Sequence, residues 1–249
     1  MPASLNITLS TAPSEPPREP LSLPGLAWPV ELNRHPRARY LRLRLDEPRR
    51  LLRLTVPRRV GQRAALDWAR RQSAWVDAQL ATIEPAQPLC PGATIPFEGA
   101  NLLLAWAEDA ARTPRLDDGQ LLCGGPRDRF ADRIARWLKG RARDVLGAET
   151  HALAAAASIA PGPVSVGDAA TRWGSCSASG AIRYNWRLIL APLEVRRYVV
   201  AHEVAHRVHM NHGPAFHALQ RDLFGGDVAP ARLTLRRVGP GLKRVGGRG

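Results

Sequence analysis

The stretch that decides the fold is residues 200–214, VAHEVAHRVHMNHGP, which holds four of the seven histidines in this 249-residue chain. His202, Glu203 and His206 form the pattern HExxH, which is typical of zinc hydrolases. On a helix, residues i and i+4 lie about 6 Å apart on one face, so both imidazoles can reach one Zn²⁺. Glu203 is rotated by about 100°, which keeps it off the metal. The pattern predicts amide hydrolysis, with Glu203 taking a proton from a zinc-bound water.

The residues upstream predict that these histidines lie on a helix. Pro192 suits the first helical turn, and the helix is expected to run from there to about Met210. Val195 and Val199 precede His202 at helical spacing, so the histidines continue a buried stripe.

A catalytic zinc site needs a third protein ligand and an open position. No Glu follows Glu203, which excludes a glutamate from further along the chain. His209 would lie about 10 Å along a straight helix from His202, and we assign it a packing or supporting role. Gly213 favours a chain reversal that can carry His212 to the metal.

Two alternatives to this arrangement arise from nearby residues. The spacing from His206 to His212 matches the metzincin pattern HExxHxxGxxH, but position 209 is histidine where that pattern has its turn glycine, so a true metzincin is not expected. Cys176, in TRWGSCS (171–177), could be the third ligand instead, since a Cys-His-His site also binds zinc. The residues alone leave both Cys176 and His212 open.

The rest of the chain mixes β and α patterns. Leucines alternate with arginines on both sides of residues 46–48, which predicts a hairpin with an arginine-bearing outer face. Alternation over Ile182–Leu190 predicts a strand of about nine residues. Further strands are expected near 102–107 and 120–123, and helices over 62–80, 130–146 and 152–157.

With these elements in place, the segment from Thr171 to Phe216 resembles the YgjP-like zinc metallopeptidases, which are related to the SprT-like proteases. The resemblance rests on TRWGSCSASGAIRYNWRLILAP (171–192), YVVAHEVAH (198–206) and NHGPAF (211–216), in this order with short spacers. It extends over residues 31–235, where the order of the upstream elements is also similar.

By position, the resemblance implies His202, His206 and His212 as zinc ligands and Glu203 as the general base. It implies an α+β fold with a minimal zincin-like core, in which the active-site helix packs on a small β-sheet. Position 217 is His where the family leads us to expect Trp. The resulting domain prediction is a disordered Pro-rich tail (1–29), a β-rich N-terminal subdomain with one Trp-bearing helix (30–125), the metallopeptidase domain (126–235) and a flexible basic tail (236–249).

The resemblance also implies a protein or peptide substrate. The strand Ile182–Leu190 could bind an extended peptide along its edge by main-chain pairing. Tyr184, Arg172 and His217 are candidates to stabilise the oxyanion.

The formal net charge of +14 favours acidic partners, with nucleic acid first. However, 34 of the 36 basic residues are arginines spread over almost the whole length, which we interpret as compositional bias. A DNA-associated protease of SprT type therefore stays an alternative. A zinc-stabilised binding module that cuts nothing is another.

Cysteine usage and hydropathy bear on the compartment. Cys90, Cys123 and Cys176 are an odd number without CxxC spacing, which favours a reducing environment. No run of 18 apolar residues and no signal-peptide pattern occurs. We expect a cytoplasmic protein with no membrane contact, and the oligomeric state is open.

Overall fold

The computed structural model describes residues 19–82, 85–160 and 162–247, which belong to two compact units, residues 1–83 and 84–249. Each unit has its own hydrophobic core. Three small sheets and six α-helices occur in these ranges, so the predicted α+β class is confirmed. None of the helices described is long and apolar enough to cross a membrane.

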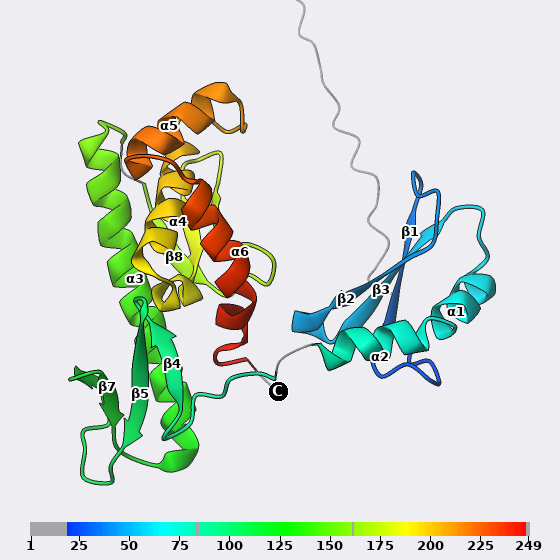
Figure 1. The fold of residues 1–249 in the computed structure, drawn as a ribbon, viewed down its shortest axis with the longest axis horizontal. Helices are drawn as coiled ribbons and strands as arrows, with labels where there is room; N and C mark the ends of the chain where they lie inside the picture. Colours follow the sequence, from blue (N-terminus) through cyan, green and yellow to red (C-terminus); the bar gives the residue numbers. More distant parts are fainter. Residues whose placement is uncertain (1–18, 83–84, 161, 248–249) are drawn as a thin grey trace, which may run out of the picture. The chain divides into compact units, whose positions relative to one another are not determined.

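The first unit is a three-stranded sheet covered by two helices (Figure 1). The predicted hairpin is present, because β2 pairs antiparallel with β3. An additional strand, β1, pairs parallel with β3 on its other side, so the sheet order is β1-β3-β2. The elements are β1 (Val30–His35), β2 (Arg42–Asp46), the 3₁₀ helix η1 (Glu47–Arg49), β3 (Leu51–Pro57), α1 (Gln62–Arg70) and α2 (Ser73–Ala81).

The helix expected over residues 62–80 is two helices, since Gln72 leaves helical geometry at φ −89° and ψ 9°. Trp75 is consequently 41% exposed and does not share the buried stripe. The first part of the tail expected to be disordered, residues 1–29, lies outside the described residues. Its last part is packed, because Leu21 forms an isolated antiparallel β-bridge with Val30 and Leu23 is buried in the core of the first unit.

The second unit contains two sheets. In the first, of order β4-β5-β7-β6, apolar side chains such as Leu104 and Leu121 pack in one core with Phe130 and Ile134 of α3. This shared core explains why the units divide at 83/84 and not at the expected 125/126. The strands are β4 (Thr94–Phe97), β5 (Ala100–Trp106), β6 (Arg115–Asp117), β7 (Gln120–Cys123), β8 (Val164–Gly167), β9 (Gly174–Cys176) and β10 (Ile182–Asn185).

The helices of this unit surround α4, which lies between α3 and α6 in Figure 1. The two helices expected over 130–157 are one, because buried residues recur every four positions from Phe130 to Ala154. The basic segment expected to be a flexible tail is helical as far as Arg244. The elements are η2 (Arg127–Arg129), α3 (Phe130–Ala156), η3 (Trp186–Leu190), α4 (Leu193–Ala205), α5 (Pro214–Phe224) and α6 (Ala229–Arg244).

The strand predicted over Ile182–Leu190 is wrong in its second half. It ends at Asn185, whose side-chain oxygen accepts a hydrogen bond of 3.0 Å from the Arg187 amide and so caps η3. The strand is also not an edge, because the sheet order is β8-β10-β9. A substrate peptide therefore cannot pair with β10 without displacing a neighbouring strand.

Candidate metal centre

The HExxH segment lies at the carboxyl end of α4, which ends at Ala205 rather than near the expected Met210. The chain then turns, with the His209 amide donating to the Ala205 carbonyl at 2.9 Å. The chain leaves the helix earlier than expected, because the C-cap of α4 is His206, and Gly213 is the N-cap of the next helix, α5. His202 and His206 thus occupy the last helical turn and its cap, opposite the loop that returns.

This turn brings together the three histidines implied by the resemblance. The ligand atoms of His202, His206 and His212 all lie within 4.8 Å of one another. Phe216, fully buried on α5, packs against all three rings, with centroid distances of 5.0, 4.5 and 4.7 Å. The Phe216 ring packs against the three imidazoles and keeps them close together. Three imidazole nitrogens so near one another form a set of ligands that suits a metal ion.

Hydrogen-bond partners outside the cluster contact the rings of His206 and His202. His206 Nδ1 lies 3.0 Å from the His209 carbonyl oxygen, so Nδ1–H donates and Nε2 keeps its lone pair. His202 Nδ1 lies 3.2 Å from the amide nitrogen of Gln220, which is buried on α5. An amide turned so that its oxygen faced Nδ1 would accept from Nδ1–H and leave Nε2 with its lone pair. The supporting role expected of His209 therefore belongs to its main-chain carbonyl and not to its side chain.

Burial also keeps these imidazoles neutral. Desolvation lowers the pKa of His202 to about 4, with smaller contributions from the other histidines. Desolvation likewise lowers the pKa of His206, against the opposing effect of its bond to the His209 carbonyl. A neutral imidazole is the form that binds a metal.

Glu203 lies beside β9 and is only 4% exposed. A Cβ added at Gly174 would lie 2.7 Å from both Cγ and Cδ of this glutamate and closer still to Oε1, so only glycine leaves room for the carboxylate there. Desolvation raises the pKa of Glu203 to about 7, with Arg172 acting in the opposite direction. Its Oε2 atom is buried and has no hydrogen-bond partner among the described residues. Such an atom costs about 1–3 kcal/mol, which a bound water or ligand would recover.

The alternative ligand, Cys176, is not a member of the histidine cluster. Its thiol donates to the Ser177 carbonyl at 3.6 Å, and burial together with Glu203 raises the pKa of the thiol. A raised thiol pKa disfavours the thiolate that binds zinc.

The oxyanion candidates lie in different surroundings. Tyr184 is buried, and its hydroxyl lies 3.0 Å from Thr150 Oγ1, which itself donates to a helix carbonyl. The Tyr184 proton is thus already used inside the core. Arg172 and His217 are both exposed, and the His217 ring lies 6.3 Å from that of His212.

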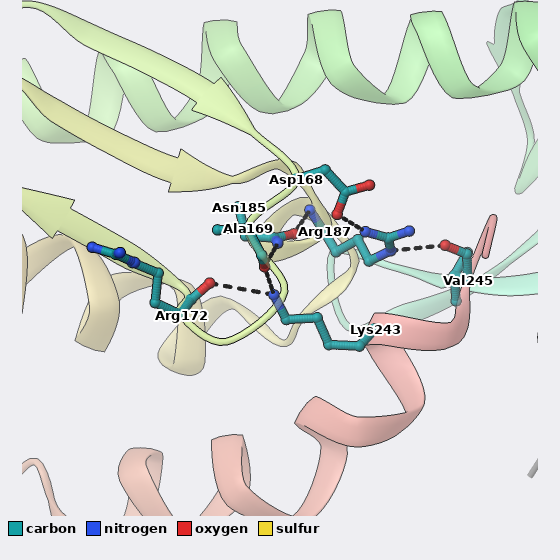
Figure 2. Close-up of polar contacts among 7 residues, drawn as sticks. All are labelled: Asp168, Ala169, Arg172, Asn185, Arg187, Lys243 and Val245. Atoms are coloured by element: carbon teal, nitrogen blue, oxygen red, sulfur yellow. Dashed lines mark hydrogen bonds and ion pairs between the residues drawn. The ribbon is translucent and has the colours of Figure 1, made fainter. Parts of the chain in front are cut away.

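A contact that sequence reasoning missed braces the loop leading to Gly174. Figure 2 shows Lys243, near the end of α6, donating to the carbonyls of Ala169 at 2.6 Å and Arg172 at 3.3 Å. Its ammonium also lies 4.4 Å from the ring centroid of Trp173. The one available signal was compositional, since Lys243 is one of only two lysines among 36 basic residues.

Arg187 ties the same loop to the chain beyond α6. The buried guanidinium donates to the Val245 carbonyl at 2.8 Å and pairs with Asp168 (Figure 2). The side chain of Asn185 donates to the Ala169 carbonyl at 2.9 Å. Desolvation and the neighbouring Arg187 lower the pKa of Lys243 to about 8. The loop 168–173 is therefore tied to α6, to the residue after it and to the end of β10.

Replacing Lys243 with methionine is expected to loosen this loop. Two carbonyls lose a charged donor, so we expect the free energy of unfolding to fall by about 1–3 kcal/mol. Amide hydrogen exchange across residues 169–174 should accelerate. The matched control is Lys139→Met on the exposed side of α3, which should change neither. Equal exchange in both variants would mean that α6 does not hold the loop.

Comparison with known proteins identifies a family for this chain. No curated protein and no solved structure matches the chain. The family model described as "YgjP-like, metallopeptidase domain" matches residues 39–237, which include the histidine cluster, Glu203 and the loop before Gly174. This match covers most of the sequence, and the chain therefore belongs to the YgjP-like metallopeptidase family.

Proposed function

We propose that this protein is a zinc-dependent metallopeptidase that hydrolyses peptide bonds, with His202, His206 and His212 holding the ion and Glu203 as general base. One observation carries the proposal: three imidazoles converge within 4.8 Å on the same helix end that bears a buried, unpartnered carboxylate oxygen. Three protein ligands with a remaining open position are typical of catalytic zinc. Packing of α4 against β9 supports a zincin-like core.

The chemistry divides between the ion and the protein. Zinc, when bound, acts as a Lewis acid that polarises a carbonyl and lowers the pKa of water to about 7. Glu203 accepts a proton from the attacking water and later delivers it to the leaving amine. Burial, which raises the pKa of Glu203 to about 7, suits a group that must gain and lose a proton near neutrality.

We place the substrate along β9. This strand pairs with β10 on one side, and no other strand in the described ranges pairs with its second side. An extended peptide can add there by main-chain hydrogen bonds, which would bring its backbone beside Glu203. The exposed Arg172, just before β9, and His217, on α5, are the side chains we propose for the oxyanion.

Metal content tests the ligand assignment. We expect one zinc per chain in the wild type and in Cys176→Ala, and none in His212→Ala. His209→Ala should keep its zinc, because the carbonyl that supports His206 remains. Mass spectrometry of the four purified proteins gives the answer. Zinc retained in His212→Ala but lost in Cys176→Ala would make Cys176 the third ligand, and no zinc in any sample would refute the proposed function.

A further inference from the structure

The arginines of the first unit are not evenly distributed in space. Residues 1–83 contain 14 arginines and 7 acidic residues. Two of the acids lie where β1 starts and β2 ends, and there they pair with arginines: Glu31 with Arg49 at 3.0 Å, and Asp46 with Arg53 at 2.8 Å. This end of the sheet is therefore electrically balanced.

The opposite end gathers arginines without acids. Because β1 and β3 run parallel, both end there, at His35 and Pro57, and β2 begins there with Arg42 opposite Thr55. The Arg34 guanidinium donates to the Val60 carbonyl at 3.1 Å, which links the end of β1 to the loop before α1. We call the following exposed residues of this region the arginine end: Arg34, Arg37, Arg39, Arg42, Arg58, Arg59 and Arg63.

Within the described part of the chain, no residue of the arginine end forms an ion pair with an acidic side chain. Seven like charges near one end of a small sheet repel one another, and a bound polyanion removes that repulsion. Guanidinium groups also match phosphate oxygens in paired hydrogen bonds. The arrangement favours a binding role for these arginines over compositional bias.

An aromatic side chain lies in the middle of this charge. Tyr40 is 82% exposed and is flanked by Arg39 and Arg42. An exposed ring among cations has no packing role in the unit, but it offers a surface on which an unpaired base can stack. Phosphate contacts from arginine combined with aromatic stacking are the features of single-strand binding surfaces.

We propose that the arginine end, with Tyr40 as a stacking platform, binds single-stranded nucleic acid. The ligand would be held through its phosphates and read with little sequence preference, since an arginine bound to phosphate carries no base information. This inference is independent of the proposed peptidase activity, because it concerns the other compact unit.

The proposal is tested by fluorescence anisotropy. A labelled DNA strand of about 20 nucleotides is titrated with the full-length protein at about 50 to 200 mM salt. Arg37→Ala, Arg39→Ala and Arg42→Ala combined should weaken binding at least tenfold at low salt. The logarithmic salt slope should fall by about 2, since each phosphate contact contributes about 0.7. Tyr40→Ala should weaken binding of the single strand but not of a duplex.

The matched control is the triple variant Arg136→Ala, Arg143→Ala and Arg197→Ala, which removes the same charge from exposed positions of the second unit. It should bind like the wild type. The proposal would be overturned by equal weakening in the two triple variants or by no binding of the wild type at low salt. It would also be overturned if the wild type preferred duplex DNA and Tyr40→Ala did not change that preference. Binding to anionic vesicles without binding to the DNA strand would identify a membrane surface instead. Zinc content and cleavage of a short peptide should be unchanged throughout.

Discussion

Replacing Glu203 with glutamine is expected to lower peptide hydrolysis by about 10³-fold, within the range for loss of a general base. Glutamine keeps the shape of the side chain beside Gly174 but cannot accept the proton from water. The zinc content should stay at the wild-type value, because Glu203 does not belong to the ligand cluster. Steady-state hydrolysis of a fluorogenic peptide, with metal analysis of the same samples, provides the measurement.

The stability of this variant supplies its control. Glu203 is a buried carboxylate with one unpartnered oxygen, and an amide has no charge to desolvate. We therefore expect the free energy of unfolding of Glu203→Gln to equal or exceed that of the wild type. Loss of hydrolysis with unchanged stability would support a catalytic role for Glu203. Unchanged hydrolysis would mean that Glu203 is not the general base, no hydrolysis by the wild type would favour a zinc-stabilised module that cuts nothing, and lost zinc would add Glu203 to the ligands.

The histidine cluster was predictable because its determinants are local. His202 and His206 are one helical turn apart, and Gly213 next to His212 marks where the following helix, α5, begins. Helical spacing and turn chemistry act over a few residues, so sequence patterns report them directly. The position of the helix end was not predictable in this way, since α4 stops at Ala205 although no proline or glycine occurs between it and Gly213.

The contacts that the sequence did not reveal connect distant positions. Lys243 donates to a carbonyl 74 residues away, and a main-chain acceptor leaves no mark in the sequence of its own residue. The His209 carbonyl that orients His206 is only three residues away, but it is also a main-chain acceptor and leaves no mark in the sequence. The alternation over Ile182–Leu190 was misleading because an apolar run that is buried on all sides fits a strand and a 3₁₀ helix equally. Long-range pairing and burial, rather than local propensity, decide these features.

Replacing Gly174 with alanine is expected to reduce peptide hydrolysis by about 10²-fold, although this residue has no side chain to take part in the reaction. The new methyl group would contact the end of the Glu203 side chain, not its backbone, so the carboxylate moves and the fold stays. A displacement of about 1 Å in a catalytic group can cost a factor of this size. Hydrolysis rates, zinc content and thermal unfolding of the variant are the measurements.

Gly140→Ala is the matched control, because a Cβ at this position of α3 meets nothing within 4 Å. It should keep full activity and gain about 0.5–1 kcal/mol of helix stability. If Gly174 acts only by leaving room for Glu203, the double variant Gly174→Ala, Glu203→Gln should be no less active than Glu203→Gln alone. A further loss in the double variant would mean that the methyl group disturbs something else, with the peptide path along β9 as the first place to look.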